Sequence, residues 1–228
     1  MYKKSSLILI ISMLFVISVQ AQSVFQVGIL PSAVLTDKKE NDWSVIYEID
    51  SRQLLSKGTF NGFTENKYEY FLTDFSVLGA KKISPKSRLA GGYLLRIEQD
   101  KIFHRFIQQY TYTHQLDSLA LSHRFSSDQT FSPAEKPEFR LRYRLATEIP
   151  LAGKTVDADE LYFKISNEYL NSWQDSEYDL EMRLVPLLGF NFRNDKKVEM
   201  GMDYRLDSFL QNNTRHSFWM NVNLLIEL

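Results

Sequence analysis

The sequence predicts an all-β protein, namely an antiparallel, up-and-down β-barrel that crosses a membrane. Three observations lead to this prediction: a secretory leader, a C-terminal strand with one apolar and one polar face, and a series of further segments with the same alternation. Successive strand side chains point to opposite faces, so alternation gives a barrel wall one face for lipid and one for a polar interior. After the leader, no apolar run has the length of a spanning helix, so any span must consist of strands.

The leader is the first element. Lys3 and Lys4 precede an apolar run from Leu7 to Val19, and Ala21 closes a small-x-small signal for a leader peptidase. The run is shorter than the roughly 20 residues of a spanning helix. We expect residues 1–21 to be a cleaved signal peptide and residues 22–228 to be a single domain, exported through the Sec pathway to the outer membrane of a Gram-negative bacterium.

Composition excludes several classes of function. The 27 basic and 28 acidic residues leave no net field that would attract nucleic acid. The chain has no cysteine, which removes disulfide scaffolds, redox pairs and thiolate metal sites. We therefore expect no nucleic-acid partner, no metal and no cofactor.

Alternation defines the strands. In the C-terminal strand, Phe218, Met220 and Val222 share one face while Asn221 and Asn223 lie on the other. The same period recurs along the chain and predicts ten strands, at residues 43–52, 68–78, 89–98, 102–114, 119–131, 139–149, 161–169, 178–192, 198–206 and 218–228.

Two segments break the pattern. Residues 25–35 are apolar but contain Pro31, which suits an edge, a broken strand or an interior segment. Bacterial single-chain barrels have even strand numbers, so we expect ten strands, with twelve as the alternative. In residues 102–114 the alternation slips near Gln108, which predicts a bulge or a kink.

Loop lengths predict an orientation. Barrels of this kind pair short periplasmic turns with longer outer loops and keep both termini in the periplasm. Residues 126–137, 171–177 and 207–215 are expected to be outer loops, and residues 115–118 and 193–197 inner turns.

A ladder of charged residues lies opposite the apolar stripe and is expected to face the lumen. Arginine and carboxylate side chains on neighbouring strands would form pairs there that fill a narrow barrel. The alternative is an ion-selective pore lining, and we favour filling. The ladder consists of Arg140, Arg142, Arg144, Glu148, Glu168, Glu181, Arg183, Glu199, Asp203 and Arg205.

The four histidines are candidates for catalysis and metal binding. They are His104, His114, His123 and His216, and none has the spacing of a zinc motif. Ser122 beside His123, and His216 beside Ser217, suggest a lipid hydrolase. Adjacent strand residues point to opposite faces, however, so neither pair forms a nucleophile and base by itself, and we expect no catalytic residue.

Aromatic residues are placed as in a membrane barrel. Trp43, Trp173 and Trp219 fall near predicted strand ends, as do many tyrosines. This distribution is typical of the aromatic girdles at the two membrane interfaces.

Five strand segments share the pattern of one known family, namely residues 87–93, 122–125, 139–144, 167–168 and 188–190. Together they resemble the bacteroidete family catalogued as domain of unknown function 2490. The resemblance spans most of the mature chain, and it implies an outer-membrane β-barrel without an accepted activity or catalytic residues.

These observations lead to the expectation of an integral outer-membrane β-barrel of unknown specific activity, either structural or a small-solute channel with a largely filled lumen. Its expected partners are outer-membrane lipid, periplasmic chaperones and the barrel assembly machinery. Two alternatives remain open: a lipid-modifying enzyme of the outer membrane that uses His123 or His216, and a soluble exported barrel that binds an apolar ligand. Alternation alone does not separate the soluble barrel from the membrane barrel.

Overall fold

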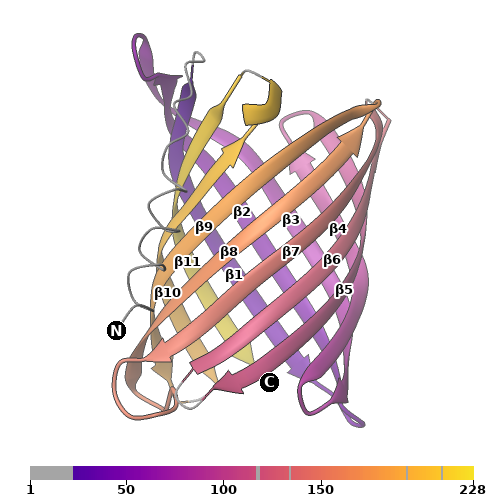
Figure 1. The fold of residues 1–228 in the computed structure, drawn as a ribbon, viewed down its shortest axis with the longest axis vertical. Helices are drawn as coiled ribbons and strands as arrows, with labels where there is room; N and C mark the ends of the chain where they lie inside the picture. Colours follow the sequence, from indigo (N-terminus) through magenta and orange to yellow (C-terminus); the bar gives the residue numbers. More distant parts are fainter. Residues whose placement is uncertain (1–22, 117–118, 134, 194, 212) are drawn as a thin grey trace, which may run out of the picture.

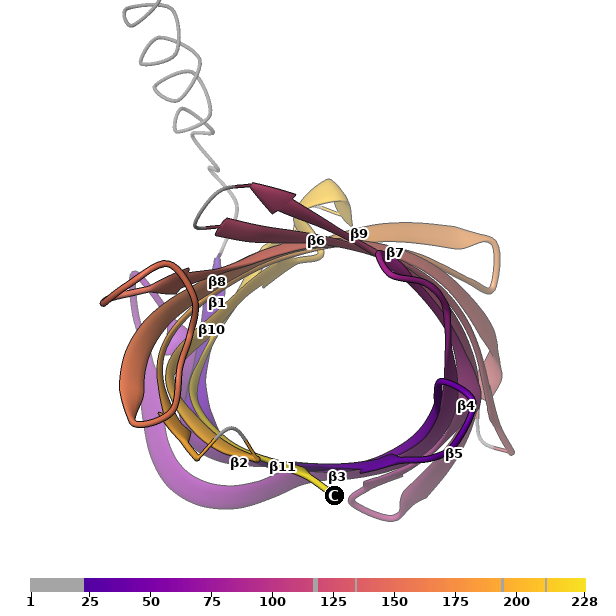
Figure 2. The ribbon, with the colours of Figure 1, turned by 90° about the horizontal axis from the view of Figure 1, so that it is seen from below.

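The structure is a computed structural model that describes residues 23–228 except 117–118, 134, 194 and 212. The described residues form one closed barrel of eleven tilted strands, shown from the side in Figure 1 and along the barrel in Figure 2. The prediction of an all-β barrel is therefore confirmed. The predicted signal peptide, residues 1–21, lies outside the described residues.

The strands follow one another around the barrel in chain order. One short 3₁₀ helix, η1 (Phe209–Gln211), lies between the last two. The strands are β1 (Val24–Lys38), β2 (Trp43–Thr59), β3 (Thr64–Ser84), β4 (Ser87–Glu98), β5 (Lys101–Leu116), β6 (Leu119–Ser132), β7 (Glu135–Pro150), β8 (Glu160–Gln174), β9 (Glu177–Phe192), β10 (Lys196–Asp207) and β11 (Arg215–Glu227).

A parallel seam closes the barrel. Each strand pairs antiparallel with the next, whereas β1 pairs parallel with β11 along a continuous register from Val24 with Arg215 to Thr36 with Glu227. In an up-and-down sheet with an odd number of strands, the first and last strands run in the same direction. Only parallel pairing can therefore close this sheet.

The predicted count of ten or twelve strands is wrong, because residues 25–35 belong to a wall strand, β1. Proline has no backbone N–H and interrupts a hydrogen-bonded ladder. The ladder between β1 and β2 is indeed interrupted at Pro31, while the ladder to β11 continues through the pair of Pro31 with Val222. The even-number rule assumed antiparallel closure, which this chain does not use.

The parallel seam also separates the two ends of the described chain. At one mouth, the Val24 N–H donates to the Thr214 carbonyl at 3.0 Å, beside the connection between β10 and β11. At the other mouth, the Lys38 N–H donates to the Leu228 carbonyl at 3.0 Å. Ser23 and Leu228 thus lie at opposite mouths, and the expectation that both termini share one side is wrong.

Two of the three predicted outer loops are shorter than expected, whereas the third, predicted at residues 207–215, is the connection at residues 208–214. β6 extends to Ser132 and β7 begins at Glu135, so most of residues 126–137 is strand, and most of residues 171–177 is strand as well. The polarity that suggested loops comes from inward side chains such as Asp128. The longest connections, residues 151–159 and 208–214, lie at opposite mouths, so loop length does not orient the barrel.

Gln108 lies in a regular strand and not at a bulge. The registers of β5 with β4 and with β6 continue through it without a shift. Its side chain is on the outer face and exchanges amide hydrogen bonds with Gln129 of β6, at 3.2 and 3.1 Å. The alternation slips there because a polar pair replaces apolar side chains on the outer wall.

The predicted aromatic girdle is wrong at Trp219, which does not lie on the outer face. Trp43 and Trp173 are exposed on the outer face, but Trp219 points inward, is 1% exposed and packs with Leu30 and Leu54. The space for its ring comes from Gly28 on β1, where an added Cβ would lie 2.5 Å from Trp219 Cζ3. This packing contact stabilises the seam between β1 and β11 on its inner side.

The seam can be tested by disulfide formation, because the native chain has no cysteine. Ala33 on β1 is the register partner of Leu224 on β11, and a cysteine pair at these positions should form an intramolecular disulfide. Gel mobility with and without reductant measures it.

The matched control combines Ala33→Cys with Met220→Cys. Met220 is the register partner of Ile29, and it lies roughly 13 Å along β11 from Leu224, the partner of Ala33. Equal crosslinking of the two pairs, or none in either, would contradict a closed parallel seam.

Candidate functional site

The candidate site is the charged interior of the barrel. Residues that pair across neighbouring strands share a face, so a register row shows which side chains meet inside. One row runs from Arg144 on β7 through Glu168 on β8 and Arg183 on β9 to Arg205 on β10. All ten residues of the predicted ladder lie on these four strands, β7 to β10.

Glu168 is the centre of this row. It is 3% exposed, accepts a hydrogen bond from Arg144 Nε at 2.7 Å and lies 3.0 Å from Arg183 Nη1. Arg183 Nε also donates to Glu181 at 2.5 Å. A buried carboxylate held by two guanidinium groups keeps its charge compensated in a site that water hardly reaches.

Asp128 of β6 holds two further ladder arginines and was not among the predicted site residues. Its side chain is fully buried, and its oxygens lie 3.2 Å from Arg140 Nη2 and 2.9 Å from Arg142 Nη2. The sequence prediction missed it because residues 126–131 were assigned both to the strand at residues 119–131 and to the outer loop at residues 126–137. The alternation of Ser126, Asp128 and Thr130 with outward residues was the signal that could have identified it.

Two ladder residues, Glu148 and Glu199, lie nearest the mouth that contains Leu228. Their partners are lysines and a tyrosine. Glu199 is 1% exposed and accepts hydrogen bonds from Lys164 and Tyr162, both at 2.8 Å. Glu148 lies 3.4 Å from Lys197. These lysines were not predicted as site residues, although Lys164 alternates with apolar side chains in its strand.

Asp203 and Arg205 pair with each other along one strand. Arg205 donates from Nε and Nη2 to the two Asp203 oxygens, at 2.9 and 2.7 Å. On the other side of the barrel, Arg96 of β4 holds Asp74 of β3 in the same bidentate way, with both distances 2.8 Å. The sequence prediction did not include the second pair, because the alternation of β3 and β4 is weaker.

Some interior arginines have no such partner. Among the residues that the structure describes, Arg52, Arg105 and Arg124 have no carboxylate oxygen within 4.0 Å. Arg52 lies over the Trp219 ring, 5.8 Å from its centroid. Arg105 is 5% exposed and donates from Nε to Thr130 Oγ1 at 2.9 Å.

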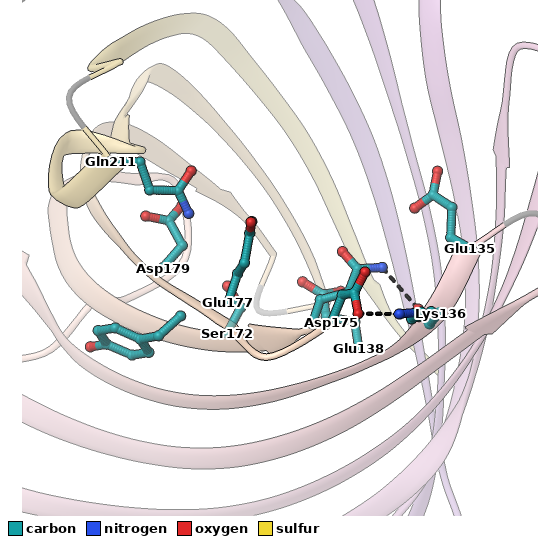
Figure 3. Close-up of a pocket in the computed structure, with 10 residues that line it drawn as sticks. Glu135, Lys136, Glu138, Ser172, Asp175, Glu177, Asp179 and Gln211 are labelled. Atoms are coloured by element: carbon teal, nitrogen blue, oxygen red, sulfur yellow. Dashed lines mark hydrogen bonds and ion pairs between the residues drawn. The ribbon is translucent and has the colours of Figure 1, made fainter.

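An acidic vestibule of about 610 Å³ lies at the mouth where β1 begins (Figure 3). Lys136 pairs with Asp175 at its rim, and Gln174 donates to the Lys136 carbonyl at 2.8 Å. A smaller cavity of about 180 Å³ adjoins it and shares part of its lining. The vestibule is lined by Glu135, Lys136, Glu138, Ser172, Gln174, Asp175, Glu177, Tyr178, Asp179 and Gln211.

Three histidines lie on the outer wall, each hydrogen-bonded through Nδ1 to a tyrosine. His104 bonds Tyr93, and two other histidines form the same contact at 2.9 Å, His123 with Tyr143 and His216 with Tyr204. Ser217 is 1% exposed inside the barrel and accepts a hydrogen bond from Gln26, so it faces away from His216. Ser122 likewise shares the inner face, opposite His123.

In the part of the chain that the structure describes, no three His, Cys, Asp or Glu side chains are grouped so that they could hold a metal ion. No helix among the described residues is long and apolar enough to cross a membrane.

Fold and interior together define a closed β-barrel with an ion-paired interior. Residues 29–216 match the family described as Protein of unknown function (DUF2490), and the chain belongs to this family. Comparisons with curated proteins and with solved structures found no match.

The ion pairs of Glu168 make a prediction about stability. Glu168→Gln keeps the size of the side chain but leaves Arg144 and Arg183 without their shared charge, so the free energy of unfolding should fall by about 3 kcal/mol or more. Urea unfolding of the refolded protein measures this change.

Glu227→Gln is the matched control. It removes one carboxylate from an exposed pair with Lys38 and should change the free energy of unfolding by about 1 kcal/mol or less. A similar effect of both substitutions would contradict the role assigned to Glu168.

Proposed function

We propose that the mature chain is an integral outer-membrane β-barrel whose interior is filled by paired charged side chains. It acts as a structural protein of the membrane or as a channel for small solutes. The observation that carries this proposal is the apolar outer face of the barrel.

Every strand contributes exposed apolar side chains to that face. Soluble monomers rarely expose a contiguous apolar surface of more than a few hundred Å². Exposure of apolar side chains to water is unfavourable, and in a membrane lipid surrounds these side chains in place of water. One such residue from each strand, in chain order, is Val27, Ile49, Val77, Leu89, Phe106, Phe125, Leu141, Tyr169, Leu188, Met200 and Met220.

The apolar side chains form a continuous surface. Met200 of β10 is 55% exposed and pairs with Leu188 of β9 and with Val222 of β11. Val222 in turn pairs with Pro31 of β1, so the surface continues across the seam. The aromatic contact between Tyr204 and Phe218, with centroids 5.1 Å apart, lies on the same face.

The interior supports the membrane barrel over a soluble barrel with an apolar ligand. A soluble carrier needs apolar side chains around an internal space and polar ones outside. Here the buried side chains of the interior include Asp128, Glu168 and Glu199, all with ionic partners. The inner apolar cluster of Trp219 and its neighbours is packed together near the seam.

The filled lumen follows from the same contacts. Lys164 on β8 reaches Glu199 on β10, so the pair spans the intervening strand. Arg144 and Arg183 approach Glu168 from both neighbouring strands. Long side chains that meet in this way occupy the space that a wide pore would need.

The proposal predicts that the protein fractionates with outer membranes and migrates faster on a gel before heating than after it. Met220→Arg, in the middle of the outer face, should lower the folded yield in lipid vesicles, since a cation at the bilayer midplane costs about 2–4 kcal/mol. Gel migration of vesicle-refolded protein measures the yield.

Glu40→Lys, in the turn between β1 and β2, is the control and should leave the yield unchanged. Recovery of the protein in the soluble fraction without a heat-dependent shift, or equal yields for both variants, would sink the proposal.

A further inference from the structure

Arg105 on β5 is a buried cation with no carboxylate within 4.0 Å among the described residues. Its neighbours are already used: Arg96 holds Asp74 through two hydrogen bonds, and Asp128 is shared by Arg140 and Arg142. Arg105 donates from Nε to the neutral hydroxyl of Thr130 at 2.9 Å. Asp74 and Asp128 act on Arg105 only from beyond contact distance. A buried charge without a counter-charge in contact is costly, so an external anion bound there would be stabilised.

Arg105 lines a space that a solute can enter. The cavity of about 180 Å³ is lined by Arg105 together with Arg96, Glu98 and Thr130. It shares Glu135, Lys136, Glu138 and Gln174 with the larger vestibule at the mouth. The guanidinium group of Arg105 is therefore buried from bulk water and still reachable from outside through the vestibule.

The same cavity contains a carboxylate that lies near the charges of Arg96 and Lys101 but contacts neither. Glu98, at the end of β4, forms no ion pair or hydrogen bond in the described part of the chain. Glu138, which also lines the cavity, lies 3.7 Å from Arg140 Nε, and Glu135 pairs with Lys101 at 2.7 Å. One cation without a carboxylate in contact and one carboxylate without a cation in contact thus face a single small cavity.

We propose that this cavity binds a small zwitterion of the α-amino acid class. Arg105 holds the carboxylate of the ligand through its Nη groups, and Glu98 accepts the ammonium group. A guanidinium group matches a carboxylate in geometry and can donate two parallel hydrogen bonds to it.

The charges around the cavity argue against a ligand that carries only one charge. An anion alone would pass the acidic vestibule of Asp175, Glu177 and Asp179 and would leave Glu98 without a partner. A cation alone would be attracted to the vestibule but would leave Arg105 uncompensated. A molecule that carries both charges satisfies both groups.

Size restricts the ligand further. A cavity of about 180 Å³ holds several water molecules. It accommodates the ammonium and carboxylate of an amino acid with a short side chain. A longer side chain would extend into the vestibule.

The test uses the full mature chain refolded in detergent micelles and titrated with glycine by isothermal calorimetry at low ionic strength. Glycine should bind at millimolar concentration or below, and acetate and methylammonium, each with one charge, should bind at least tenfold more weakly. Arg105→Met should lower the affinity for glycine at least tenfold.

Arg52→Met is the matched control, because Arg52 is an interior arginine that also lacks a carboxylate within 4.0 Å but does not line the cavity. It should bind glycine as the wild type does.

Glu98→Gln leaves the buried cation in place and should also lower the affinity for glycine at least tenfold. This variant replaces Arg105→Met if Arg105→Met does not fold.

Absence of glycine binding to the wild type would overturn the proposal, as would unchanged affinity in Arg105→Met or Glu98→Gln. Acetate that binds as tightly as glycine would show an anion site without selection for a zwitterion. The cavity is enclosed by barrel strands, so these results are independent of the membrane proposal, which is tested by fractionation and heat-dependent migration.

Discussion

The hydrogen-bonded closure between β1 and β11 is the constraint on which the rest of the structure depends. Once the sheet closes, it has no free edge, and its side chains are divided into an outer and an inner set. The inner set must fit a space fixed by eleven strands. Arginines, lysines and carboxylates long enough to reach a second strand fill that space, and the contact of Tyr162 with Glu199 across β9 shows how directly they do so.

Closure also makes the interior charges specific for one register. A slip of one residue along a strand moves every side chain to the other face. Such a slip in β8 would carry Glu168 to the outer wall and leave Arg144 and Arg183 inside without it. The ion pairs therefore favour the native register as well as filling the lumen, while the apolar outer residues favour it from the other side.

The sequence predicted the elements whose two faces differ most in chemistry. The strands β7 and β11 were readable because Arg140, Arg142 and Arg144 alternate with apolar residues, and because the last residues alternate equally well. β1 was misjudged because Pro31 suggests a break, and the parallel partner that supports this strand lies at the far end of the chain. No local period contains that information.

The sequence likewise predicted only part of the candidate site. The ladder on β7 to β10 was identified from alternation, whereas Asp128 was hidden in a segment polar enough to resemble a loop. Arg105 gives no signal in the sequence, because its significance depends on which carboxylates other strands bring near it. Trp219 was assigned to the outer girdle although its alternation with Phe218 and Met220 places it on the inner face. What the sequence does not show is that Gly28 leaves the space for its ring.

The measurement that most directly tests the account is the conductance of the refolded protein in a planar bilayer. A closed barrel filled by ion-paired side chains predicts no large, long-lived open state, although small or rare openings are compatible with it. Arg142→Glu should then show no steady current either. A stable porin-like current in the wild type, abolished or reversed in ion preference by Arg142→Glu, would contradict a filled interior and show that the charged ladder lines a water-filled path.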